Sequence, residues 1–94
     1  MIINFLNTET EKIYLHGFSK KIPQHIQKIA VRKLDMIDAA ERLDDLKVPP
    51  ANRLEVLRGD LKGFYSIRIN DRYRIVFKFK NGNAHDVYVA DYHN

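Results

Sequence analysis

The sequence predicts an α+β fold, in which two N-terminal helices pack on one face of a small antiparallel β-sheet. Apolar residues recur every three or four positions in the first half of the chain and every second position in the second half. The pair Asn81-Gly82 separates two of the alternating segments and is typical of a tight hairpin turn. At 94 residues, the chain has the size of one domain with a single core.

The start of the chain carries signals for a short apolar strand and a first helix. Residues 1–5 are mostly apolar, so we expect a short strand at an edge of the sheet. Thr8 and Glu11 have the spacing of a capping box, which predicts that a helix begins there. Gly17 tolerates the left-handed conformation that ends many helices, so this helix is expected to end near His16.

A longer second helix is predicted from Pro23 to about Leu43. Proline is favourable in the first turn of a helix, where its missing N–H is no loss. Apolar residues then recur at spacings of three and four and form one stripe: Ile26, Ile29, Ala30, Leu34, Ile37 and Ala40. Pro49 and Pro50 exclude a helix beyond this region, because the residue before a proline avoids helical geometry.

The second half predicts a meander of three or four antiparallel strands, over residues 53–58, 65–69, 73–79 and 84–90 or slightly beyond. We expect the helices to cover the face that carries the apolar set Ile67, Ile69, Ile75, Phe77, Val87 and Val89. The opposite face would then present basic and aromatic side chains to solvent, namely Arg68, Arg74, Lys78 and Tyr88.

The positive charge is concentrated in the strand-rich half. Residues 1–45 carry seven Lys or Arg and seven Asp or Glu, whereas residues 46–94 carry nine and five, which accounts for the net charge of +4. A basic sheet face with aromatic residues suits single-stranded RNA, because Arg binds phosphate and aromatic rings stack on bases. The alternative is an ordinary solvated face, on which Lys and Arg only discourage edge pairing.

Composition excludes several other classes of protein. The chain contains no cysteine, so there is neither a disulfide framework nor a thiolate zinc site. No histidine or carboxylate pair has convincing metal-ligand spacing, and no glycine-rich phosphate loop occurs, so no metal or cofactor is expected. We see no signal peptide and no membrane span, and we expect a cytoplasmic protein.

The residues Asp91, Tyr92 and His93 bring together three side chain types that transfer protons. RNA cleavage without a metal needs a base for the 2′-hydroxyl, an acid for the leaving oxygen and cations for the phosphate. Glu55 would face the same region if Leu54 and Val56 pointed into the core. A polar tail at the end of the chain is the competing interpretation.

Several segments, in this order and spacing, resemble the HigB-type toxins of bacterial type II toxin–antitoxin modules, within the RelE-like superfamily of ribosome-dependent ribonucleases. The segments are residues 32–40, 49–55, 57–60, 63–68, 70–75 and 91–93, preceded by Met1-Ile2 and Phe5. The resemblance implies a toxin that cleaves mRNA in the ribosomal A site. It also implies neutralisation by a helix-turn-helix antitoxin, in a heterotetramer that binds operator DNA through the antitoxin.

The resemblance also assigns roles to individual residues. It places Asp91, Tyr92 and His93 among the catalytic residues, a basic residue at Arg58 and a strand arginine at Arg74. We therefore predict a catalytic set of Glu55, Asp91, Tyr92, His93 and Arg74, and a set that binds RNA phosphates of Arg58, Arg68, Arg72 and Lys78. Some relatives carry histidine where this chain has Glu55. Because glutamate can act as a base but cannot donate a cationic hydrogen bond, a non-catalytic protein that binds RNA, the ribosome or an antitoxin stays open as an alternative.

Overall fold

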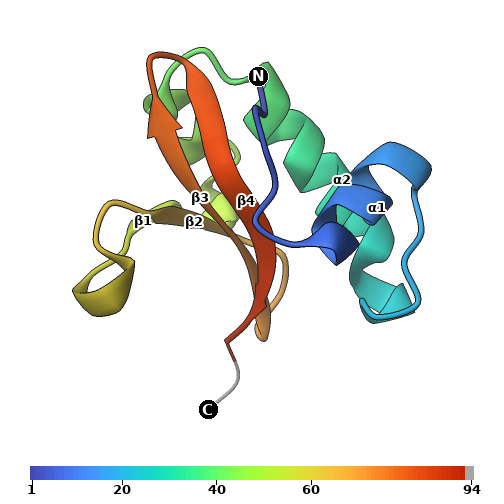
Figure 1. Cartoon of the computed structure of the whole chain (residues 1–94). Helices are drawn as coiled ribbons and strands as arrows, with labels where there is room; N and C mark the ends of the chain where they lie inside the picture. Colours follow the sequence, from blue (N-terminus) through green and yellow to red (C-terminus); the bar gives the residue numbers. More distant parts are fainter. Residues whose placement is uncertain (93–94) are drawn as a thin grey trace.

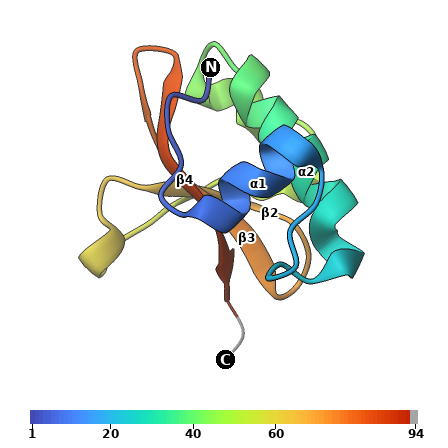
Figure 2. The same ribbon diagram turned by 45° about the vertical axis from the view of Figure 1, so that its right-hand side comes forward.

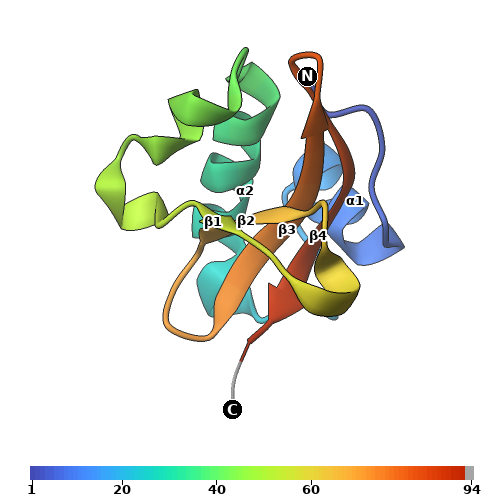
Figure 3. The same cartoon turned by 90° about the vertical axis from the view of Figure 1, so that its left-hand side faces the viewer.

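The computed structural model describes residues 1–92 and confirms the predicted α+β fold. Two α-helices precede four strands that form one antiparallel sheet in the order β1-β2-β3-β4 (Figure 1). Figure 3 looks onto the face of the sheet that is turned away from α1 and α2, and both helices lie behind the strands, so the near face is free of α-helix. The elements are α1 (Thr8–His16), α2 (Gln24–Ala39), β1 (Glu55–Val56), β2 (Tyr65–Arg68), β3 (Tyr73–Lys80) and β4 (Asn83–Asp91), with short 3-10 helices at η1 (Leu43–Lys47), η2 (Pro50–Asn52) and η3 (Gly59–Leu61).

Helix α1 has the predicted bounds but a different N-cap. The Asn7 side chain, rather than that of Thr8, accepts a hydrogen bond from the Thr10 amide at 2.9 Å. Asn7 is a favourable cap because its backbone is extended and its amide oxygen satisfies one of the free N–H groups at the helix start. Gly17 ends the helix as predicted, in the left-handed conformation at φ 74°.

Helix α2 buries the predicted stripe but ends earlier than the sequence predicts. Its last residue is Ala39, because the next backbone is extended at Ala40 (φ −66°, ψ 129°). The amides of Glu41 and Arg42 then donate to the carboxylate of Asp45, which gives them partners outside any helix. The predicted continuation of α2 to Leu43 is therefore wrong.

The N-terminal segment lies along β4, as the predicted edge strand requires (Figure 2). It makes two isolated parallel bridges, Ile2 with Ala84 and Phe5 with Val87, rather than a continuous strand. Ile2 and Phe5 also pack against the core. The first residues of the chain thus extend the sheet at its β4 edge.

The core lies between the helices and the sheet. Its fully buried side chains come from α1, α2, η1 and strands β2 to β4, and include Ile13, Ile26, Leu34, Ile37, Leu46, Ile67, Ile75, Phe77 and Val87. Burial of a side chain of this size contributes about 1.5–3 kcal/mol, so this layer supplies most of the driving force for folding. None of the helices within residues 1–92 is long and apolar enough to cross a membrane.

Candidate active site

The register of the four strands defines what we call the helix-free face of the sheet. Residues paired directly across an antiparallel sheet point to the same side. One row crosses all four strands: Glu55, Ser66, Val76 and Tyr88. The next row consists of Arg68, Arg74 and Ala90. Alternation places these two rows on the side of the sheet opposite to Ile67, Ile75 and Phe77, which face the helical layer. The Arg68 guanidinium, at the end of β2, is still close enough to α2 to influence Lys33.

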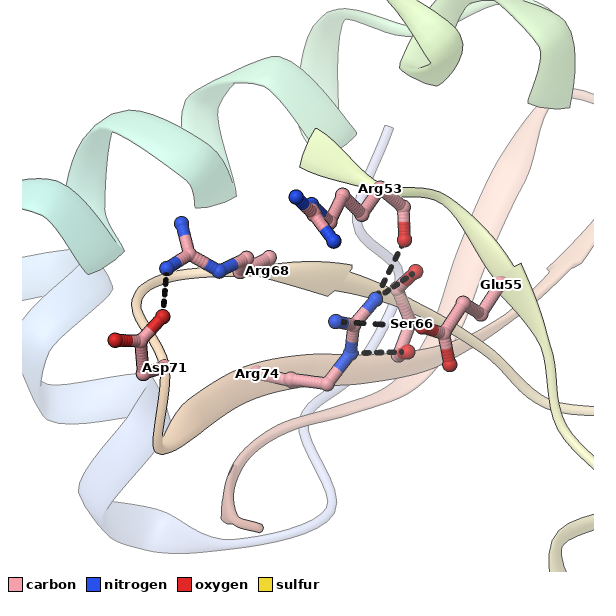
Figure 4. Close-up of polar contacts among 6 residues, drawn as sticks. All are labelled: Arg53, Glu55, Ser66, Arg68, Asp71 and Arg74. Atoms are coloured by element: carbon pink, nitrogen blue, oxygen red, sulfur yellow. Dashed lines mark hydrogen bonds and ion pairs between the residues drawn. The ribbon is translucent and has the colours of Figure 1, made fainter. Parts of the chain in front are cut away.

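Arg74 is held in place at the centre of this face (Figure 4). Its Nε donates to Ser66 Oγ at 2.7 Å, and its Nη2 donates to the backbone carbonyls of Arg53 and Ser66. The residue is only 9% exposed, so the prediction that it faces solvent is wrong. The residues before β1 cover this part of the sheet, and the carbonyl of Arg53 lies against the Arg74 guanidinium. Ser66 and Val76, on the same face, are completely buried.

Glu55 neutralises part of this buried charge. Its Oε1 lies 3.6 Å from Arg74 Nη1, and its side chain remains 55% exposed. Burial lowers the pKa of the Arg74 guanidinium below its ordinary value, whereas the Glu55 carboxylate opposes that shift. Glu55 therefore has a fixed cationic partner and is also accessible from solvent. A group that exchanges protons with a substrate needs both properties.

Tyr92 lies close enough to Arg74 and Glu55 to interact electrostatically with both. Burial is the largest influence on its phenol and raises its pKa, and the nearby Tyr88 raises it further. The Arg74 charge lowers the pKa of Tyr92 and the Glu55 charge raises it, so these two effects oppose each other. The phenol therefore keeps its proton near neutral pH and can donate a hydrogen bond.

Arg68 lies directly opposite Arg74 in the β2–β3 pairing, so two guanidinium groups occupy one row. Arg68 Nη2 donates to the carboxylate of Asp71, which is almost fully exposed in the turn before β3 (Figure 4). A surface ion pair of this kind is weak in water, and an incoming phosphate can compete with Asp71 for the guanidinium.

Lys78 lies towards the other end of the helix-free face, beyond the irregularity in the β3–β4 register. Its Nζ is 4.9 Å from the centroid of the Phe64 ring and 3.6 Å from Asp86 Oδ2. Tyr88 meets the same Phe64 ring edge-on, with centroids 6.5 Å apart. A basic side chain and two aromatic rings are thus grouped beside the Glu55–Arg74 pair, in the row that Tyr88 shares with Glu55.

Arg58 lies in the loop after β1 and not beside Arg74. It occupies the N-cap position of η3 without a side-chain hydrogen bond to that turn, and it lines a hollow of about 380 Å³ together with Lys62, Phe64, Tyr65 and Val56. Strand β1 has only two residues, because the left-handed backbone of the preceding Arg53 and the loop that begins at Leu57 limit it. The predicted strand over 53–58 is therefore too long, and Val56 is 68% exposed instead of pointing into the core.

Asp91 is held by Arg72 rather than by the Glu55–Arg74 pair. Arg72 donates to both carboxylate oxygens, from Nε at 2.9 Å and from Nη2 at 2.8 Å. Asp91 pairs with Tyr73, and this pair is next to the pair formed by Arg74 and Ala90. Because successive residues alternate, Asp91 and Tyr92 point to opposite sides of the sheet. The predicted catalytic residue His93 lies outside the described residues.

Of the nine predicted site residues, the structure thus brings Glu55, Arg74 and Tyr92 together with Arg68 beside them, and it places Lys78, Arg58 and the Arg72–Asp91 pair around them. The sequence analysis did not identify three residues that contribute to this site. The hydroxyl of Ser66, the carbonyl of Arg53 and the side chain of Asn52 hold the arginine or the segment that covers it. Alternation placed Ser66 on the correct face but gave no sign that it binds Arg74.

An arginine, a carboxylate and a phenol on a basic sheet face can bind a phosphate, remove a proton and donate a hydrogen bond. Among the described residues, no group of three or more His, Asp or Glu side chains is placed to hold a metal ion. Fold and site together define a small α+β protein equipped for acid–base chemistry on a phosphodiester. The same fold occurs in a solved YoeB–YefM toxin–antitoxin heterotetramer from Staphylococcus aureus, with a TM-score of 0.62, 20% identity, and coverage of 100% of this chain and 97% of that one.

Sequence comparison then identifies the family. Residues 3–93 match the family model described as the RelE-like toxin of the type II toxin–antitoxin system HigB. The chain is 46% identical over 68 residues to Toxin HigB-1 of Vibrio cholerae, with 72% of each chain covered. It is 32% identical over 94 residues to Endoribonuclease HigB of Proteus vulgaris, with 99% of this chain and 100% of that one covered. This chain belongs to the HigB-like family of RelE-like toxins.

Proposed function

We propose that this protein is the toxin of a toxin–antitoxin pair and a metal-independent endoribonuclease that cleaves mRNA in the ribosomal A site. The observation that carries the proposal is the buried Arg74, held within 3.6 Å of the half-exposed Glu55 on a basic sheet face. A cation fixed in this way costs no reorganisation when charge develops on a phosphate. Family membership and the name of the Proteus relative, an endoribonuclease, support the same activity.

The proposed reaction is attack of a 2′-hydroxyl on the adjacent phosphorus. Glu55 takes the proton of the 2′-hydroxyl, the bond between O2′ and phosphorus forms, and the bond from phosphorus to O5′ breaks. The leaving O5′ takes a proton from His93, so the products are a 2′,3′-cyclic phosphate and a 5′-hydroxyl. Arg74 stabilises the negative charge on the phosphorane, and Tyr92 donates a hydrogen bond to a phosphate oxygen or to the leaving oxygen.

The flanking groups are proposed to bind the rest of the RNA. Arg68 and Arg58 contact phosphates on either side of the scissile bond, and Lys78 contacts a further phosphate beside the Phe64 and Tyr88 rings, which are available to stack on bases. Arg72 acts indirectly in this scheme. By holding Asp91 it fixes the end of β4, from which Tyr92 reaches the site.

The proposed protein partner is a helix-turn-helix antitoxin, in a heterotetramer that binds operator DNA through the antitoxin in the cytoplasm. Membership of a toxin–antitoxin family supports an antitoxin partner, and the similar Staphylococcus structure is a heterotetrameric toxin–antitoxin complex. The helix-turn-helix class of the antitoxin and the binding of operator DNA are inferred from the resemblance to HigB-type toxins.

Cleavage in a translating extract tests the proposal against a protein that only binds the ribosome. We expect wild-type protein to cut the translated mRNA at defined codon positions. Glu55→Gln should cut at least about 100-fold more slowly, because it removes the base but keeps the size of the side chain. Glu41→Gln, at an exposed position after α2, is the matched control and should cut like wild type. Slowed translation with intact mRNA would support the non-catalytic alternative instead.

A further inference from the structure

A line of buried polar groups joins helix α2 to the segment that covers the site. Lys33, on α2, is 8% exposed, and its Nζ donates to Oδ1 of Asn52. Asn52 is completely buried, and its Nδ2 donates to the carbonyls of Leu46 at 3.2 Å and Val48 at 3.4 Å. The Asn52 side chain therefore ties α2, η1 and η2 together at a single point.

The next residue, Arg53, has a backbone conformation that needs such a tie. Its φ of 45° and ψ of 57° are left-handed, which is unfavourable for a residue with a Cβ atom. Its amide donates to the Pro50 carbonyl at 3.0 Å, and its own carbonyl accepts a hydrogen bond from Arg74 Nη2. An extended Arg53 would turn this carbonyl away from the guanidinium.

The buried position of Lys33 is unfavourable for its positive charge. Burial lowers the pKa of its ammonium, and the charges of Arg32 and Arg68 lower it further. A lysine at a buried position of α2 is therefore accounted for by the hydrogen bond that it donates to Asn52, because an apolar residue would fill the same position without desolvating a charge.

We propose that Lys33 and Asn52 are positioning residues for the cleavage reaction. They hold Arg53 in its left-handed conformation, so that its carbonyl, with Ser66, aims the Arg74 guanidinium at Glu55 and at the phosphate of the substrate. The proposal rests on the proposed function and assigns this chain two residues that act on the reaction through Arg74 and do not touch the RNA.

A pair of substitutions at Arg53 isolates the backbone from the side chain. Arg53→Asn and Arg53→Val both remove the guanidinium of Arg53, but asparagine tolerates the left-handed conformation and the β-branched valine does not. We expect the kcat for mRNA cleavage of Arg53→Asn to exceed that of Arg53→Val by about 10-fold or more, since a small misplacement of a catalytic group is costly. The concentration of toxin that gives half-maximal cleavage should be similar for the two variants.

The Nε–H resonance of Arg74 in an isotope-labelled sample provides a readout that does not depend on catalysis. It should stay at its wild-type position in Arg53→Asn and shift in Arg53→Val. Equal kcat values for the two variants, or an unmoved Arg74 resonance in Arg53→Val, would overturn the positioning role. If wild-type protein cleaves no RNA, the proposed function fails, and the resonance still decides whether the line of contacts orients Arg74.

Lys33→Met carries the same test if Arg53→Val does not fold. The methionine keeps most of the side chain volume but leaves Asn52 Oδ1 without the donor that Lys33 supplies. We expect a shifted Arg74 resonance and a kcat that is about 10-fold lower, with wild-type behaviour in the control Lys28→Met at an exposed position of the same helix. A Lys33→Met protein with the Arg74 resonance and the kcat of wild type would contradict the proposal.

Discussion

Replacing Arg74 by lysine tests whether the site depends on the shape of the guanidinium or only on its charge. Arg74 donates to Ser66 Oγ and to the carbonyls of Arg53 and Ser66, and its other terminal nitrogen lies near Glu55. A lysine ammonium is a single donor centre and cannot satisfy these groups together. One strong hydrogen bond to a charged group would be lost, which predicts a free energy of unfolding about 1.5–3 kcal/mol lower than that of wild type.

The effect of the same substitution on catalysis should be larger. Loss of one fixed donor to the developing charge on the phosphate predicts cleavage slower by about 100- to 1000-fold. The assays are urea unfolding followed by circular dichroism, and fragment yield from a translated mRNA. The control is Arg32→Lys at an exposed position of α2, which should leave both quantities unchanged. An Arg74→Lys protein that unfolds and cleaves like wild type would refute the role given to the guanidinium.

Three further predictions concern the pKa shifts and the hairpin. Because burial raises the pKa of Tyr92 above the ordinary value of a tyrosine, the phenol stays protonated while histidine and carboxylate groups titrate. Tyr92→Phe should therefore lower the cleavage rate without changing the shape of its pH profile between about pH 6 and 9, and a lost alkaline limb would contradict this. Gly82→Ala should lower the free energy of unfolding by about 1–2 kcal/mol, because φ is 78° and the new Cβ would lie 3.2 Å from the Glu41 carbonyl; a stabilised variant would refute this strain. Burial lowers the pKa of Lys33 in the folded state, so the unfolded chain binds the Lys33 proton more tightly than the folded protein does. The free energy of unfolding of wild type, relative to that of Lys33→Met, should therefore rise as the pH increases towards about 10.5. A fall over this range would contradict the lowered pKa of Lys33.

The sequence was sufficient for features that depend on local periodicity. The spacing of apolar residues located α2 and its buried stripe, and alternation located β2, β3 and β4 on the correct faces. Asn81-Gly82 forms the predicted turn with positive φ at both residues, 53° and 78°. Each of these features is fixed by residues that are close together in the chain, so a single sequence reveals it.

Features that depend on distant contacts were not predictable in the same way. Alternation puts Arg74 on the face away from the helices, but its burial comes from the carbonyl of Arg53, 21 residues earlier. The end of α2 was missed for a different reason, because the contact there is local: the Asp45 carboxylate accepts from the amides of Glu41 and Arg42, and apolar periodicity does not report such a contact. The ion pair that joins Asp91 to Arg72, 19 residues earlier in the chain, gave no sign in the sequence, where Asp91 is adjacent to Tyr92.

The chemistry of a single nucleotide tests the central claim most directly. If Glu55 and Arg74 organise attack by the 2′-hydroxyl, then a translated mRNA with one 2′-deoxy nucleotide at a mapped cleavage position should resist cleavage there and still be cut at its other positions. The fragments from unmodified mRNA should end in a 2′,3′-cyclic phosphate and a 5′-hydroxyl. Undiminished cleavage at the deoxy position, or fragments with a 5′-phosphate, would contradict the proposed site.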